Sequence, residues 1–182
     1  MSSAHRASAC APTDVEAWLS DLGLEPLERA DREGVTSWDL VLDGRRRAAL
    51  RITLILDPAL ALICWALFAP PINDSFRKSY RKLLRWNDEL PFVKFSIAED
   101  DRPVLVAELP ARTVDRDSLG LALARQLAVA DRLHAGSIDW LKGGAWPTGP
   151  GETSAGGPGT RLLDRYAAEL GELLDVEAGV GA

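Results

Sequence analysis

The chain has 182 residues, a hydrophobic content of 47% and a formal net charge of −6. This length suits one domain with an appended segment, and the composition suffices for a buried core. The negative net charge argues against nucleic acid as the main partner, because a phosphate backbone attracts positively charged proteins.

The two cysteines do not form a disulfide framework, because Cys10 lies in a Ser/Ala-rich segment and Cys64 in an apolar run. We therefore expect two free thiols and a cytoplasmic location, with Cys64 as a small core residue. Residues 1–11 lack the apolar region of a signal peptide. We expect residues 1–12 to form a flexible tail.

The first predicted element is a helix that begins near Thr13. Thr13 and Glu16 have the spacing of a capping box. One helical face is then formed by Val15, Trp18, Leu19 and Leu22. Gly23 is a natural stop for this helix.

Three strands are predicted next. Alternating apolar residues at 38–42 and 50–56 predict two strands, joined by a tight turn at Asp43-Gly44. The Asp57-Pro58 turn then leads into an apolar run at 59–69, whose Ala and Leu content also suits a helix. This run is too short for a membrane span, which needs about 20 residues, and its flanking prolines favour a strand. Because both faces are apolar, we expect this strand to be central or covered on both sides.

The second half of the predicted fold repeats helix and strands. A helix is expected from Asn73 or Asp74 to about Asp88, followed by strands at 93–97 and 104–109 around a polar turn at 99–102. A third helix should run from near Asp115 to about His134. The predicted inner faces comprise Phe76, Tyr80, Leu83 and Leu84 in the second helix and Leu119, Leu123, Leu127 and Ala130 in the third.

The composition changes after residue 135. Residues 143–160 include seven glycines and three prolines, so we expect a flexible linker at 136–160. Beyond it, Leu162, Tyr166, Leu170 and Leu173 predict a short amphipathic helix at 161–175 that needs a partner surface. The chain is therefore predicted to be α+β, with an antiparallel five-stranded sheet, helices on one face, an α-β-β-β-α-β-β-α order and a C-terminal tethered helix.

The sequence LLRWNDELPFVKFSI at residues 83–97 resembles the bacterial YbjN family. In that family a helix ends at an Asn, a Leu-Pro pair follows, and a strand begins with a Lys-Phe step. A second matching stretch is VLVAELP at 104–110, which leads into a Leu-rich helix. The element order over 13–135 is similar to the type III secretion chaperone-like fold. The resemblance implies this fold, a homodimer that holds extended segments of partner proteins, and a sensory or regulatory role.

No catalytic or metal-binding motif is recognisable. His5 lies in the predicted tail, and His134 ends a helix, where an imidazole suits the helix dipole. The cysteines and histidines lack zinc spacing, residues 99–101 lack the calcium-loop pattern, and no Gly-x-Ser-x-Gly turn is present. We expect no enzymatic activity, no catalytic residue, no metal and no cofactor. An enzyme of unfamiliar type is the least favoured hypothesis.

Two features are candidate partner-binding sites. Arg77, Arg81 and Arg85 lie at i, i+4 and i+8 of the second helix, with Lys78 and Lys82 beside them. They form either a patch for an acidic partner, nucleic acid or anionic lipid, or a solvated helix face, which is the simpler interpretation. The triplet at 45–47 adds basic charge at a turn.

The second candidate is the pair of tryptophans around residues 142–144. Trp140 and Trp146 either anchor a partner or pack back onto the domain.

The leading hypothesis is a non-enzymatic module that binds a partner protein or peptide segment, chaperone-like or regulatory. The alternative is a nucleic-acid-associated or sensory regulator that uses the basic second helix. In the first case, the C-terminal helix is also a candidate cover for the binding surface.

Overall fold

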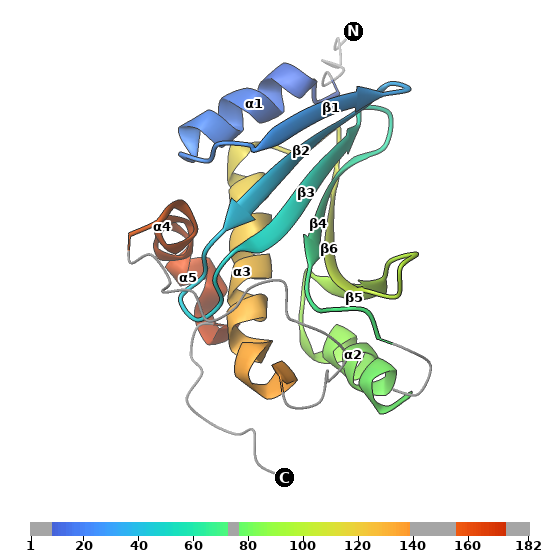
Figure 1. The fold of residues 1–182 in the computed structure, drawn as a ribbon. Coiled ribbons are helices and arrows are strands. Elements are labelled where there is room, and N and C mark those ends of the chain that lie inside the picture. The colour runs from blue at the N-terminus through green and yellow to red at the C-terminus, as the bar shows by residue number, and fades with distance from the viewer. Residues whose placement is uncertain (1–8, 73–76, 139–155, 174–182) are drawn as a thin grey trace, which may run out of the picture.

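The computed structural model of the chain describes residues 9–72, 77–138 and 156–173. These residues form an α+β fold with a six-stranded antiparallel sheet in the order β1-β2-β3-β4-β6-β5 (Figure 1). The strands are β1 (Glu28–Arg32), β2 (Val35–Leu42), β3 (Leu50–Asp57), β4 (Ala61–Leu67), β5 (Lys94–Ile97) and β6 (Pro103–Pro110). The helices are α1 (Pro12–Asp21), α2 (Arg77–Glu89), α3 (Arg116–Ile138), α4 (Pro158–Arg165), α5 (Ala167–Leu170) and the 3-10 helix η2 (Gly171–Leu173).

The sheet has six strands, not the five that were predicted, because β1 was missed. It pairs with β2 through a turn at Glu33 and Gly34, both of which have positive φ angles. The sequence of β1, ERADR, contains one apolar residue and shows no apolar alternation. Such a charged composition is typical of an edge strand, which must avoid pairing with other chains.

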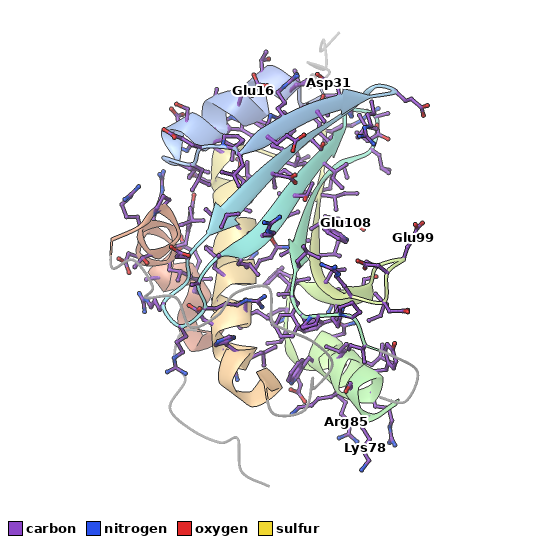
Figure 2. All side chains as sticks on the ribbon, viewed as in Figure 1. Glu16, Asp31, Lys78, Arg85, Glu99 and Glu108 are labelled. Atoms are coloured by element: carbon purple, nitrogen blue, oxygen red, sulfur yellow. The ribbon has the colours of Figure 1, made fainter. Side chains whose placement is uncertain are left out.

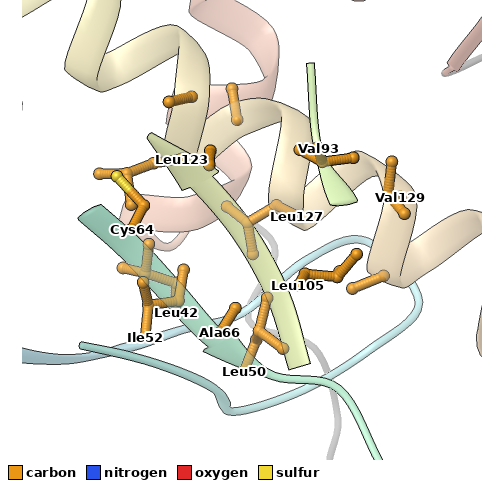
Figure 3. Close-up of a cluster of buried hydrophobic side chains, with 14 of the residues drawn as sticks. Leu42, Leu50, Ile52, Cys64, Ala66, Val93, Leu105, Leu123, Leu127 and Val129 are labelled. Atoms are coloured by element: carbon orange, nitrogen blue, oxygen red, sulfur yellow. The ribbon is translucent and has the colours of Figure 1, made fainter. Parts of the chain in front are cut away.

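The apolar run at 59–69 forms β4, which lies between β3 and β6 as a central strand. On one face its Cys64 is paired across the sheet with Leu54 and Ala107 and is buried in the core that α3 covers (Figure 3). The other face, with Ile63, Trp65 and Leu67, is only half-buried. The strand is therefore central as predicted, but the described elements cover only one of its faces fully.

The connection between β2 and β3 is not the tight Asp43-Gly44 turn that was predicted, because it spans residues 43–49. The carboxylate of Asp131, on α3, accepts hydrogen bonds from three consecutive backbone N–H groups of this loop, at 2.6 Å from Arg45, 3.1 Å from Arg46 and 2.9 Å from Arg47. A Cβ at Gly44 would lie 2.2 Å from the Asp131 Oδ1 atom. Gly44 is therefore required for the approach of α3, not for a two-residue turn.

The first helix begins differently from the prediction. Its N-cap is Ala11 with Pro12 in the first turn, and the Asp14 carboxylate accepts a hydrogen bond of 2.8 Å from the Ala11 N–H. The predicted Thr13–Glu16 capping box is therefore wrong. Glu16 instead pairs with Arg29 of β1 at 2.7 Å, which ties the helix to the edge of the sheet (Figure 2).

The third helix starts after Asp115, as predicted, and Asp115 accepts a hydrogen bond of 2.8 Å from the Ser118 N–H. Nearly every side chain from 119 to 131 is buried, because the sheet packs on one side and α4, α5 and η2 pack on another. The predicted C-terminal helix is broken at Tyr166 into α4 and α5. Its predicted apolar residues Leu162, Tyr166 and Leu170 are buried.

Both cysteines are free and buried. Desolvation raises the pKa of the Cys64 thiol to about 12 and that of Cys10, with a contribution from Asp14, to about 11. Cys10 is held two residues before α1 by a 2.8 Å hydrogen bond from its N–H to the Ala111 carbonyl. Low thiolate content makes both thiols poor nucleophiles.

Within the described residues, no helix is both long enough and apolar enough to cross a membrane.

Candidate partner-binding surface

Helix α2 is anchored to the end of the sheet by aromatic packing. The Trp86 ring centroid lies 5.5 Å from that of Phe95, on β5, and 6.4 Å from that of Phe68, which follows β4. Leu83 is buried as predicted, but Leu84 is 67% exposed and Trp86 takes the inner position instead. This packing fixes which face of α2 points to solvent.

A polar clasp fixes the same helix to the backbone of β5. The Asn87 side chain accepts a hydrogen bond of 2.5 Å from the Phe95 N–H and donates one of 3.1 Å to the Phe95 carbonyl. The Lys94 ammonium donates to the Asn87 and Leu90 carbonyls at the end of the helix. These residues belong to the stretch that resembles the YbjN family, so the motif has a structural role at the junction of α2 and β5.

The solvent face of α2 carries a cluster of cations that we call the α2 basic surface: Lys78, Arg81, Lys82 and Arg85. Lys78, Arg81 and Arg85 are exposed, and Figure 2 shows Lys78 and Arg85 projecting away from the sheet. A groove of about 430 Å³ lies along this surface, with Trp86 and Glu89 also in its lining. The Lys82 ammonium lies 5.3 Å from the centroid of the Trp86 ring.

Three of these cations form no ion pair within the described part of the chain. No ion pair involves Lys78, Arg81 or Arg85 there, whereas five arginines elsewhere pair with acids: Arg29, Arg45, Arg102, Arg116 and Arg165. Arg29 pairs with Glu16, and Arg45 pairs with Asp164 at 2.7 Å. Two members of the predicted basic triplet at 45–47 are thus used internally, because Arg45 forms this ion pair and Arg47 is buried and donates to the Leu67 carbonyl at 3.1 Å.

The structure brings together Arg81 and Arg85 of the predicted site with Lys78 and Lys82, which the sequence places beside them. Arg77 is the first residue of α2, and its side chain lies outside the described residues. Trp140 and Trp146 also lie outside the described residues. Partner binding by these five residues remains a prediction.

One candidate was missed, on the sheet face opposite α3. Trp65 is half-buried in a row of cross-strand neighbours that runs Glu28, Asp39, Thr53, Trp65, Val106 and Lys94. A shallow groove of about 270 Å³ near the β1 edge of this face is lined by Leu27, Val41, Arg51 and Leu67, among others. The signal was present in the sequence, because Ile63, Trp65 and Leu67 alternate along β4.

The residues described contain no group of three or more His, Cys, Asp or Glu side chains that could hold a metal ion. His134 lies near Asp131 and Arg47. Burial, with the charge of Arg47, lowers the pKa of the His134 imidazole, and Asp131 opposes the shift. The Asp131 carboxylate already accepts three backbone hydrogen bonds, so its acceptor capacity is largely used in fixing the loop at 43–49.

The model of the YbjN family, described as "Putative bacterial sensory transduction regulator", matches residues 11–135. No curated protein matches the chain. The matched part contains the sheet, α2 and the whole α2 basic surface, and it ends before α4. Because the match covers more than half of its residues, the chain belongs to the YbjN family.

Proposed function

We propose that the chain is a non-enzymatic regulatory module that binds a partner protein, and that the partner docks on the α2 basic surface. One observation carries this proposal. In a protein with a net charge of −6, Lys78, Arg81 and Arg85 have no ion pair within the described residues, although other arginines pair with acids. The family description as a regulator supports the same role.

The spacing of these cations lowers the stability of the helix, which supports a role for them in binding. Like charges four residues apart, as in Lys78–Lys82 and Arg81–Arg85, destabilise a helix by about 0.2–0.5 kcal/mol per pair. The helix contains five basic and two acidic residues, and both acids lie at its last two positions. A partner that supplies negative charge would relieve this repulsion.

The chaperone-like form of the proposal adds that the protein holds an extended segment of its partner and acts as a homodimer. The resemblance of the element order to the type III secretion chaperone-like fold supports this form. Light scattering of the purified protein tests the dimer, and a monomer mass at every concentration would remove that part while leaving partner binding in place.

The second candidate function is association with nucleic acid through the same helix. The row of cations favours it, since lysine and arginine contacts to phosphates supply most non-specific affinity. The net charge of −6 and the internal use of Arg45 and Arg47 oppose it.

Site-specific photocrosslinking tests the proposed surface in cells. A crosslinking amino acid replaces Leu84, on α2, or Leu60, at the opposite end of the sheet; the two side chains are matched in exposure at 67% and 69%. We expect a protein adduct at position 84 that disappears when Arg81→Glu and Arg85→Glu are added, and none at position 60. Equal adducts at both positions, or none at either, would contradict the proposal.

A further inference from the structure

We infer that the ligand of the α2 basic surface is a short acidic peptide segment of the partner, with carboxylates that face the four cations and an apolar side chain beside them. This inference rests on the proposed function and names the chemistry of its partner. It starts from charge, because Lys78, Arg81 and Arg85 present unpaired positive charge within the described residues.

The length of the cluster limits the size of the ligand. From residue 78 to residue 85 the helix rises about 10 Å, at about 1.5 Å per residue. An extended peptide covers that distance with about three residues. The groove of about 430 Å³ beside Trp86 also accepts side chains, not a folded domain. The geometry therefore fits a short segment, in which neighbouring residues carry the charge.

The residues that border the cluster indicate that the ligand also carries an apolar side chain. Leu84 is 67% exposed on the same helix and lies between Lys82 and Arg85 in sequence. On the other side, the Trp86 ring lies under the Lys82 ammonium and lines the groove. Glu89 ends the groove with a negative charge, so a ligand with carboxylates along its whole length would be repelled there. A segment that mixes acidic and apolar residues matches these borders.

A peptide fits these charges better than a nucleic acid. A duplex carries about one charge per 1.7 Å of helix axis over a long surface, and neutralising it requires more cations than one helix face provides. Two of the three arginines at 45–47 do not extend the surface, because Arg45 pairs with Asp164 and Arg47 is buried. The net charge of −6 would repel a long polyanion more than a short peptide.

The test is fluorescence anisotropy with the full-length chain and defined probes. The first probe is a labelled peptide that carries one glutamate for each of the four cations, flanked by leucine, and the second has glutamine at those positions. A labelled DNA duplex is the third. We expect binding of the glutamate peptide alone, weakened by added salt as surface charges are screened.

Two matched double variants locate the site. Arg81→Glu with Arg85→Glu should weaken binding of the glutamate peptide by about tenfold or more, as expected when close opposite charges become like charges. Arg32→Glu with Arg112→Glu changes two exposed arginines outside the α2 basic surface and gives the same net charge, so it should leave the affinity within about twofold. Circular dichroism checks the fold, and Arg81→Gln with Arg85→Gln serves if the reversal disturbs α2.

Each other outcome overturns the inference. Equal weakening by both variants would mean attraction to net charge alone. Tighter binding of the duplex, with the same dependence on Arg81 and Arg85, would assign the surface to nucleic acid. If no peptide binds while the crosslink at position 84 persists, the acidic ligand is wrong and the proposed function stands. If that crosslink is also absent, both fail.

Discussion

At the scale of single residues, Asp131 determines the shape of a loop that lies 84 to 86 residues away in sequence. Its carboxylate is the common acceptor for the N–H groups of residues 45–47. Asp131 also offsets part of the desolvation that lowers the pKa of the buried Arg47 to about 10. Guanidinium groups stay charged in proteins. The Asp131 carboxylate therefore compensates the buried charge of Arg47 and also accepts hydrogen bonds from three backbone N–H groups.

Asp131→Ala should therefore destabilise the fold strongly. Leaving buried N–H donors without an acceptor costs about 1–3 kcal/mol each, and the Arg45 and Arg46 donors are partly accessible to water. We expect the free energy of unfolding in urea to fall by about 2–4 kcal/mol. Asp88→Ala removes an exposed carboxylate of α2 and should change it by less than about 0.5 kcal/mol. Similar values for the two variants would show that the loop does not depend on Asp131.

His134 gives the molecule a specific dependence on pH. The pKa of its imidazole is lowered in the folded state from its ordinary value of 6.5, so the unfolded chain binds the proton first as the pH falls. The contribution of His134 to stability is therefore complete above 6.5 and is lost as the pH falls toward the folded-state pKa. Urea titrations from about pH 7.5 to about pH 5.5 should show a steeper loss for the natural protein than for His134→Gln. Parallel curves would contradict this assignment.

At the scale of elements, the polar clasp between α2 and β5 satisfies backbone groups at the outer edge of β5, where no further strand of the described residues pairs. β5 lies at the edge of the sheet, and the Asn87 amide bonds to both backbone groups of Phe95, as a neighbouring strand would. Edge strands with free backbone groups promote association between chains. The Asn of the family-like motif therefore protects an edge as well as ending a helix.

Asn87→Ala should have two effects that can be measured separately. Losing two hydrogen bonds should lower the free energy of unfolding by about 1–3 kcal/mol. The exposed Phe95 backbone should also make the protein self-associate, seen as a concentration-dependent rise in scattered light. Asp88→Ala, one residue further along α2, is the control and should show neither effect. A destabilised variant whose scattered light does not rise with concentration would separate the hydrogen bonds from edge protection.

At the scale of the whole molecule, local patterns predicted most of the fold. Alternation predicted β2, β3, β5 and β6, and the prolines beside 59–69 identified β4 as a strand. What failed depended on distant contacts. The Asp43-Gly44 dipeptide indicates a tight turn, but Asp131 opens it into a longer loop. β1 lacks apolar alternation because it is an exposed edge strand, held by pairing with β2 and by the Arg29–Glu16 ion pair instead of by apolar burial.

The candidate surface was predictable only in part, because local spacing can be read from the sequence and distant contacts cannot. Helical spacing groups Arg81 with Arg85, and this follows from sequence. The sequence does not predict which cations form ion pairs, because a pair such as Arg45 with Asp164 joins residues that are 119 positions apart. The exposure of Leu84 was also missed, because the aromatic contacts of Trp86 with Phe68 and Phe95 set the rotation of α2.

The C-terminal helices test whether the molecule acts as one unit. They pack on α3, where a Cβ at Gly120 would lie 2.3 Å from the Tyr166 Oη atom. In an unobstructed helix, Gly→Ala stabilises by about 0.5–1 kcal/mol. Here we expect Gly120→Ala to destabilise the protein and to speed hydrogen exchange of α4 and α5.

In a Tyr166→Ala background the obstruction is gone, so Gly120→Ala should become neutral or stabilising. Gly120→Ala in the natural background also tests the idea that the C-terminal helix covers the binding surface. α4 and α5 contact α3, whereas α2 contacts β5, so loosening the C-terminal helices should leave acidic peptide affinity at the α2 basic surface unchanged. If Gly120→Ala instead raised the peptide affinity, the C-terminal helices would be shown to cover the binding surface. Only a surface that these helices occlude would bind more ligand when they detach.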